Sequence, residues 1–182
     1  MRENLNTKEI LSLALKNHKN NNLKEAENYY KSVLKENPNN FDANYLLGTL
    51  LLQKQDFNKS KIFFENALKI NSSHSDLNNN LGIVNGELGK QSDALVFFKK
   101  AIDVNPKNVN ALNNLGTEYK NIGKYDDAIK IYERVIKMQP NNILGLNKLG
   151  MIFNETFKFE KAKICYEKVI GIDPNNYEAY NN

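Results

Sequence analysis

The sequence predicts an all-α protein built from five successive copies of a 34-residue helix pair. Glycine follows leucine at four positions spaced by 34 residues, and the four prolines share a second position of the repeat. A small residue followed four positions later by an aromatic residue defines a third. A fixed period of this length is the signature of a repeat protein. These residues are Gly48, Gly82, Gly116 and Gly150; Pro38, Pro106, Pro140 and Pro174; and the aromatics Tyr30, Phe64, Phe98, Tyr132 and Tyr166.

Each copy is predicted to hold two helices, as residues 109–142 illustrate. Apolar residues recur at steps of three and four from Ala111 to Ile122 and again from Ala128 to Ile136, which is a helical period. Gly123 predicts the stop between the two helices. Pro140 separates one pair from the next, because proline lacks an N–H and clashes with the preceding turn. The small residues let paired helices approach closely, and the aromatic residue is predicted to fill the gap between neighbouring pairs.

These motifs resemble the tetratricopeptide repeat, whose 34-residue signature runs through Leu-Gly, Tyr, Ala, Phe and Pro. The resemblance implies a right-handed α-solenoid of antiparallel helix pairs, with a concave groove lined by the first helix of each pair. Two departures stand out: Asn44 and Asn78 occupy a position that holds Trp in the family, and Ser72 replaces a proline. We therefore expect residues 1–182 to form one array with units 7–40, 41–74, 75–108, 109–142 and 143–176, and a truncated sixth unit at 177–182.

Composition and charge exclude several classes of protein. The 25 basic and 21 acidic residues are scattered and give a net charge of +4, so no nucleic-acid partner is expected. No stretch approaches the roughly 18 apolar residues of a membrane span, and the N-terminus does not read as a signal peptide. The single Cys165 cannot form an internal disulfide, which fits a reducing compartment. We therefore expect a cytoplasmic protein with no membrane partner.

No catalytic constellation is found in the sequence. The two histidines, His18 and His74, lie far apart and are interpreted as solvated surface residues near turns. Cys165 occupies a position otherwise held by larger residues and is interpreted as a packing residue. There is no phosphate-binding glycine loop and no paired metal-ligand spacing. We predict a chain that is not an enzyme and that needs no cofactor or metal.

Asparagines in the first helices are the candidate binding residues. Repeated at one position of successive units, they would form a ladder along the groove, and an Asn amide both donates to and accepts from a peptide backbone. The pattern resembles the tetratricopeptide arm of O-linked N-acetylglucosamine transferases, which implies that the Asn before Leu-Gly grips a substrate chain. The alternative is that an Asn-rich chain places polar residues on a solvated face. The predicted contacts are Asn80 and Asn114, with Tyr45, Asn79, Asn113, Asn147 and Lys148 nearby.

A second family site, the carboxylate clamp for chaperone C-termini, is not matched. That clamp needs an Asn just after Leu-Gly, and the chain has Leu15, Thr49, Ile83, Thr117 and Met151 there.

The two ends of the array give different predictions. Asn6 is predicted to cap the first helix, with Glu9 completing a capping box. Residues 177–182 begin a further helix that is too short to be stable alone. We therefore expect apolar surface around Ile164, Val169 and Ile172 to be uncovered, the chain to be a piece of a longer one, and self-association through this end.

Three functions remain open from the sequence. The favoured one is a non-catalytic scaffold that binds a protein or an extended peptide in the groove. The second is the substrate-recognition arm of a larger enzyme, by analogy with arrays that precede glycosyltransferase or sulfotransferase domains. The third is a purely structural assembly part.

Overall fold

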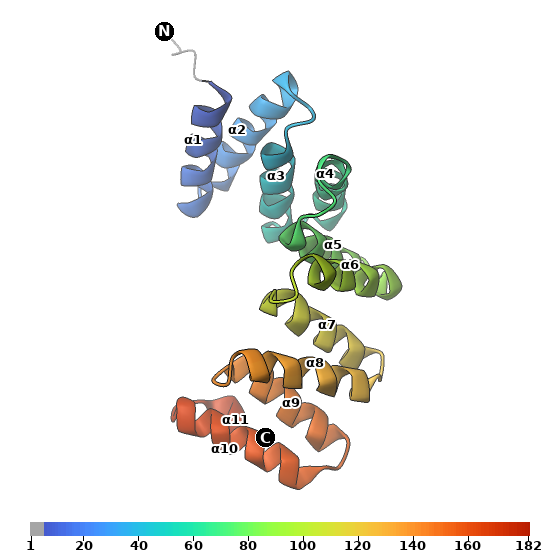
Figure 1. Cartoon of the computed structure of the whole chain (residues 1–182). Helices are drawn as coiled ribbons and strands as arrows, with labels where there is room; N and C mark the ends of the chain where they lie inside the picture. The colour runs from blue at the N-terminus through green and yellow to red at the C-terminus, as the bar shows by residue number, and fades with distance from the viewer. Residues whose placement is uncertain (1–5) are drawn as a thin grey trace. The chain divides into compact units, whose positions relative to one another are not determined.

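The computed structural model describes residues 6–182, which form helices joined by short turns and contain no strand (Figure 1). The all-α prediction is confirmed. The helices are α1 (Thr7–Lys19), α2 (Leu23–Glu36), α3 (Phe41–Gln53), α4 (Phe57–Ile70), α5 (Ser75–Glu87), α6 (Gln91–Val104), α7 (Val109–Asn121), α8 (Tyr125–Met138), α9 (Ile143–Glu155), α10 (Phe159–Ile172) and α11 (Tyr177–Asn181).

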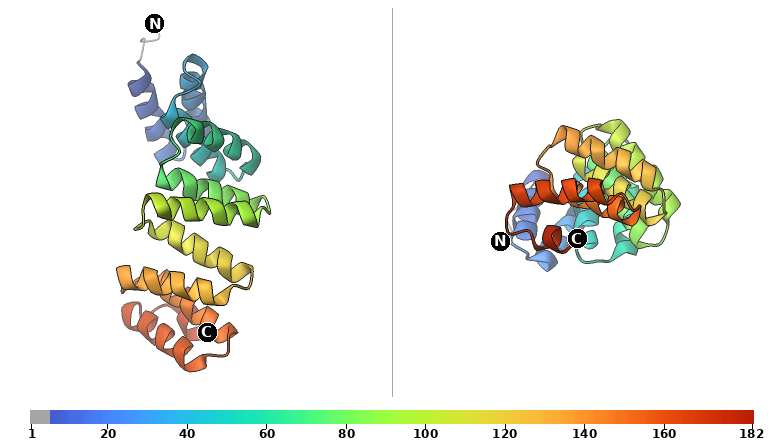
Figure 2. Two further views of the ribbon diagram at one scale, coloured as in Figure 1. Left: turned by 45° about the vertical axis from the view of Figure 1, so that its right-hand side comes forward. Right: turned by 90° about the horizontal axis from the view of Figure 1, so that it is seen from below.

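The chain divides into two compact units, residues 1–97 and 98–182, and α6 crosses the boundary. In unit 1, α1 pairs with α2 and α3 pairs with α4; α3 also contacts α1 and α5. In unit 2, α7 pairs with α8 and α9 with α10, while α7 also contacts α9. The two views in Figure 2 show α8, α9 and α10 packed as successive layers of unit 2. Within each unit the odd-numbered helices are therefore neighbours.

At the Leu-Gly position the two helices of a pair leave no room for a side chain. A Cβ atom on Gly116 would lie 2.8 Å from the ring of Tyr132, and one on Gly48 would lie 2.6 Å from the ring of Phe64. Both rings are fully buried. The aromatic residue thus packs inside its own pair as well as against the next one: Phe64 also belongs to the cluster that includes Leu77 of α5. Glycine is required there because any side chain would overlap a ring that has no space to retreat.

The turn inside each pair uses a left-handed backbone at one equivalent position. Gly89 and Gly123 adopt it with φ of 72° and 74°, which confirms the stop predicted at Gly123. Asn21, Gln55 and Phe157 adopt it with φ near 60°, and for a side-chain-bearing residue this conformation is strained. Unit 1 and unit 2 therefore tolerate the same turn with different residues.

Side chains cap the start of every odd-numbered helix. Asn6 accepts from the Glu9 N–H at 3.1 Å while Glu9 accepts from the Asn6 N–H at 2.8 Å, so the predicted capping box is confirmed. Asn6, Asn40, Asn108, Asn142 and Asn176 hold equivalent positions, and His74 takes that position in α5. Capping satisfies N–H groups that have no partner within a helix.

The last six residues form α11, although the sequence alone predicts that this segment is too short for stability. Asn176 caps it by accepting from the Ala179 N–H at 3.1 Å, and Ala179 is buried against the core of unit 2. Helix formation is favourable here because packing offsets the nucleation cost. The expected uncovered surface is found at Ile164 and Ile172, whereas Val169 is fully buried.

Candidate functional site

The odd-numbered helices carry all of the predicted contact residues. Tyr45 lies on α3, Asn79 and Asn80 on α5, Asn113 and Asn114 on α7, and Asn147 and Lys148 on α9. The structure brings Tyr45 and Asn80 together in unit 1. In unit 2 it places Asn113 and Asn147 at equivalent positions of the neighbouring helices α7 and α9.

In unit 1, Tyr45 is the centre of an aromatic cluster. Its ring stacks on Phe41 at 6.0 Å and 8°, and it packs at 5.1 Å against the imidazole of His74. Burial raises the pKa of the Tyr45 hydroxyl, and the charge of Asp76 adds to the rise. A hydrogen bond with Asn80 opposes it. Asn80, one of the predicted contact residues, is therefore already hydrogen-bonded to Tyr45.

His74 has a structural role that the sequence interpretation missed. Its Nδ1 accepts from the Leu77 N–H at 3.1 Å and caps α5, so this nitrogen must be unprotonated. The other histidine, His18, lies 3.3 Å from the Tyr30 hydroxyl and 3.0 Å from the Gln53 side chain. Both histidines are partly exposed and lie at helix ends, as predicted, but each also makes side-chain contacts that the sequence interpretation did not include. The signal for His74 was its place in the repeat, where every other unit has an Asn cap.

In unit 2, Asn113 is buried next to the Tyr132 hydroxyl, which has hydrogen-bond partners. Tyr132 donates to the backbone carbonyl of Asn113 at 3.2 Å and lies 2.8 Å from the Thr117 hydroxyl. The side chain of Asn113 is only 8% exposed, and its Oδ1 has no hydrogen-bond partner among residues 6–182. A buried amide oxygen without a partner costs free energy, since it has lost its hydrogen bonds to water and gained none in the protein.

Asn147 holds the equivalent position on α9 and is also buried. It is 3% exposed, its Nδ2 donates to Glu178 of α11 at 3.1 Å, and its Oδ1 is likewise buried without a partner in the described chain. Lys148 and Asn114, which follow these two residues in the sequence, are partly exposed. The face of unit 2 therefore presents buried amides next to partly exposed polar side chains.

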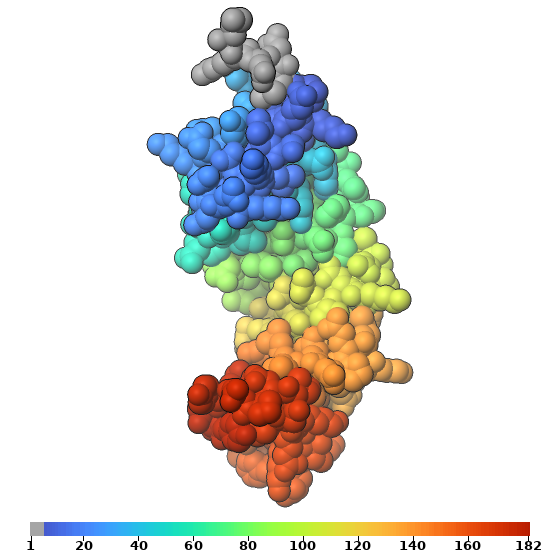
Figure 3. All heavy atoms as spheres, turned by 90° about the vertical axis from the view of Figure 1, so that its left-hand side faces the viewer, coloured from blue at the N-terminus to red at the C-terminus, as the bar shows by residue number. Residues whose placement is uncertain are grey.

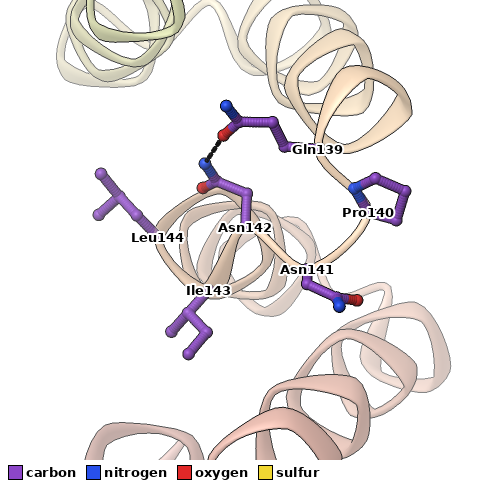
Figure 4. Close-up of a pocket in the computed structure, with 6 residues that line it drawn as sticks. All are labelled: Gln139, Pro140, Asn141, Asn142, Ile143 and Leu144. Carbon is purple, nitrogen blue, oxygen red and sulfur yellow. Dashed lines mark hydrogen bonds between the residues drawn. The ribbon is translucent and has the colours of Figure 1, made fainter.

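An open hollow of about 580 Å³ lies at the turn between α8 and α9 (Figure 4). It is lined by residues 139–144. Asn142 donates to Gln139 at 2.7 Å, and Figure 4 shows Ile143 and Leu144 directed away from this bond. Leu144 is half exposed and is the first-turn residue of α9, which also carries Asn147. Helix α9 thus carries both the exposed apolar side chain of Leu144 and the buried amide of Asn147.

The remaining reactive groups do not form a chemical site. Cys165 is buried, and burial raises the pKa of its thiol, which keeps it protonated and poorly nucleophilic. Among residues 6–182, no group of three or more His, Cys, Asp and Glu side chains is placed to hold a metal ion. None of the helices in this range is long and apolar enough to cross a membrane.

Comparison with protein families decides what kind of chain this is. Sequence profiles of the tetratricopeptide repeat match residues 18–79, 75–108, 109–142 and 145–176. The chain belongs to the tetratricopeptide repeat family. A comparison with curated protein sequences finds no match.

Solved structures of several other proteins resemble the chain along most of its length. YrrB, described as having an unusual peptide-binding site, is 24% identical and has a TM-score of 0.81; the match covers 97% of this chain and 91% of YrrB. MamA of Desulfovibrio magneticus RS-1 is 18% identical with a TM-score of 0.85, covering 94% and 97%. PilF of Pseudomonas aeruginosa is 16% identical with a TM-score of 0.83, covering 95% and 79%. At this identity the likeness shows the fold.

Two further residues of this tetratricopeptide repeat face were not predicted from the sequence. Glu178 is the partner of Asn147, and Glu118 of α7 is 9% exposed with a buried, unpartnered Oε1. Glu118 stands where other units place unrelated residues, whereas the position of Glu178 also holds an acidic residue at Asp42 and Asp76, which was the signal for it.

Proposed function

We propose that this chain is a non-catalytic interaction scaffold that binds an extended peptide on the odd-helix face of unit 2. Asn113 and Asn147 are the proposed central contacts, and Asn114 and Lys148 flank them. The observation that carries this proposal is the buried Asn113 amide, which has no partner for its Oδ1 in the described chain.

The repeat fold does not require an asparagine at this position. The equivalent residues in unit 1 are Leu11, Tyr45 and Asn79, and the first two pack as apolar or aromatic side chains. Leaving a buried polar atom unsatisfied costs about 1–3 kcal/mol. A residue that weakens the fold without serving it is characteristic of a functional site.

The chemistry of the two amides suits a peptide backbone. Each side chain can donate and accept, so it can pair with the N–H and C=O of an extended chain regardless of the peptide's sequence. Rotation of the Asn113 amide exchanges its two ends, which lets either polar atom face a ligand. The peptide-binding site named in the description of YrrB supports this kind of partner. The apolar hollow beside Leu144 would add contact with a peptide side chain.

Unit 1 is proposed to contribute less. Asn80 is engaged with Tyr45, so using it to bind a peptide would first break that hydrogen bond. Asn79 is 6% exposed. We keep Asn80, Asn79 and Tyr45 as secondary contacts.

The proposal is tested with a displayed library of random peptides. The most enriched peptide is synthesised and titrated calorimetrically against the chain and two variants, Asn113→Ala and Asn28→Ala. Asn28 is the matched control, because it is an exposed asparagine inside the even helix α2. We expect Asn113→Ala to weaken binding about tenfold, which corresponds to about 1.4 kcal/mol, and Asn28→Ala to leave it unchanged. Equal affinities in all three proteins, or a library that yields no binder, would refute the proposal.

A further inference from the structure

One asparagine of the chain is followed by glycine, at Asn85-Gly86, and this dipeptide lies inside α5 of unit 1. In a flexible chain Asn-Gly is especially prone to deamidation, because glycine has no side chain to hinder attack by its own backbone nitrogen on the asparagine amide. The repeat requires neither residue. Leu51, Tyr119 and Phe153 hold the position of Asn85 in three of the other units, and no other unit has glycine at the position of Gly86.

The folded chain holds both ends of the Asn85 amide. Its Oδ1 accepts from the Lys61 ammonium group of α4 at 2.7 Å, and its Nδ2 donates to the backbone carbonyl of Leu81 at 2.7 Å. Figure 3 shows the atoms of unit 1, coloured blue to green, closely packed over the face toward the viewer. Asn85 itself is 0% exposed, so water does not reach its side chain in the folded state.

The backbone of α5 also prevents the reaction. Deamidation begins when the Gly86 backbone nitrogen, after losing its proton, bonds to Cγ of Asn85. Inside a helix that nitrogen is occupied by the backbone hydrogen bonds, and the Asn85 side chain points back along the helix to Leu81, away from Gly86. The carbonyls of Asn85 and Gly86 in turn accept from the N–H groups of Lys90 and Gly89 at 2.8 and 2.9 Å, which fixes this end of α5.

We infer that Asn85 is a latent deamidation site, closed in the folded chain and opened when α5 unfolds. In the unfolded segment the Gly86 nitrogen bonds to Cγ, the side-chain nitrogen leaves as ammonia, and a five-membered succinimide ring forms. Water then adds to either carbonyl of the ring and opens it to aspartate or isoaspartate. The net reaction consumes one water and releases one ammonia, and it is independent of the proposed peptide site.

Neither product fits the place that Asn85 occupies. An aspartate has no donor for the Leu81 carbonyl, so one carboxylate oxygen faces that carbonyl oxygen, although the other can still pair with Lys61. An isoaspartate lengthens the backbone by a methylene group and displaces the hydrogen bonds from Lys90 and Gly89 that end α5. Deamidation therefore converts a transient unfolding of α5 into a lasting loss of stability in unit 1.

Peptide mapping by mass spectrometry tests the inference with the full chain, incubated at neutral pH either folded or in guanidinium chloride. We expect the mass change of an amide converted to a carboxylate at Asn85 in the denatured chain. In the folded chain it should be at least about a hundredfold slower, because the reaction requires a cooperative opening. Asn80, which is followed by Leu81 in the same helix, is the internal control and should react slowly in both states.

Gly86→Ala is the matched variant. Its Cβ would lie 3.9 Å from the Cβ of Ala94, which is an ordinary contact, and alanine favours a helix, so the variant should fold like the wild type by circular dichroism. In guanidinium chloride it should lose the fast reaction at Asn85, because the added methyl group hinders the attacking nitrogen. At intermediate denaturant the wild-type rate should rise in step with the unfolded fraction.

Equal rates in the folded and the denatured chain would overturn the inference, because Asn85 would then have no protection to lose. Two other results would do the same. One is a denatured chain in which Asn85 reacts no faster than Asn80, and the other is a denatured Gly86→Ala variant that reacts as fast as the wild type.

Discussion

Unit 1 and unit 2 share their internal packing but differ at the predicted contact residues of their odd helices. Gly48 against Phe64 in unit 1 matches Gly116 against Tyr132 in unit 2. On the odd-helix face, however, Asn80 is bonded to Tyr45 in unit 1, whereas unit 2 leaves the Oδ1 of Asn113 buried without a partner in the described chain.

This difference distinguishes residues that the repeat fold requires for packing from residues that are available to bind a ligand. The contact between the two helices of a pair is fixed by geometry, so its residues recur in both units. The outer face of the first helix is constrained only by solubility and by binding. Asn78 of unit 1 also has a buried Oδ1 without a partner in the described chain, but its Nδ2 holds the preceding turn by donating to the carbonyls of Ser72 and His74. The Oδ1 atoms of Asn113 and Asn147 in unit 2 are the ones that we propose a partner completes.

The largest expected effect concerns the shared packing. Gly116→Ala and Gly48→Ala should each lower the free energy of unfolding by about 1–3 kcal/mol, because the new methyl group overlaps a buried ring. Gly171→Ala is the control. Its Cβ enters open space, and it should raise stability by up to about 1 kcal/mol through helix propensity. Urea unfolding followed by circular dichroism measures all three.

Similar losses at Gly48 and Gly116 would support the shared packing. If only one of the two were destabilising, the units would not be built alike and the comparison would fail.

The next largest effect is a loss of stability in alkali through the buried tyrosines. Burial raises the pKa of Tyr30 to about 12, above the value of about 10 in an unfolded chain. The unfolded state therefore loses this proton first as the pH rises. The free energy of unfolding should fall between pH 10 and pH 12 by up to about 2 kcal/mol. Urea unfolding at a series of pH values should show a smaller fall in Tyr30→Phe.

In unit 2, burial raises the pKa of Tyr132 in the same direction, so Tyr132→Phe should also reduce the alkaline loss. An alkaline profile unchanged by both variants would show that neither hydroxyl titrates differently in the folded state.

A smaller effect on stability should distinguish the two helix pairs of unit 2, α7 with α8 and α9 with α10. Tyr132→Phe removes a hydroxyl with two partners and should cost about 1 kcal/mol. Tyr166→Phe removes one with none in the described chain and should be neutral or slightly stabilising. Thermal unfolding monitored by calorimetry compares them. Equal costs would mean that Tyr166 has a partner in solution, such as water.

Most of the fold could be predicted from the sequence, but less of the candidate site. The spacing of Gly48, Gly116 and Gly150 predicts the close helix contacts, because only a repeated steric need keeps glycine at one position of a helix. The contact of Glu178 with Asn147 could not be predicted, since it depends on which side chains face each other across helices, whereas the cap made by His74 follows from its place in the repeat. The burial of Asn113 also escaped the sequence, which suggested an accessible ladder.

Urea unfolding of the wild type, Asn113→Ala and the matched Asn28→Ala, each with and without the enriched peptide, tests the central claim most directly. Both substitutions gain the same helix propensity, so the difference between them isolates the buried amide. The account predicts that Asn113→Ala is about 1 kcal/mol more stable than the control. It also predicts that the peptide raises the unfolding midpoint of the wild type and of Asn28→Ala but barely that of Asn113→Ala. A destabilised Asn113→Ala with an undiminished response to the peptide would make Asn113 a structural residue and contradict the account.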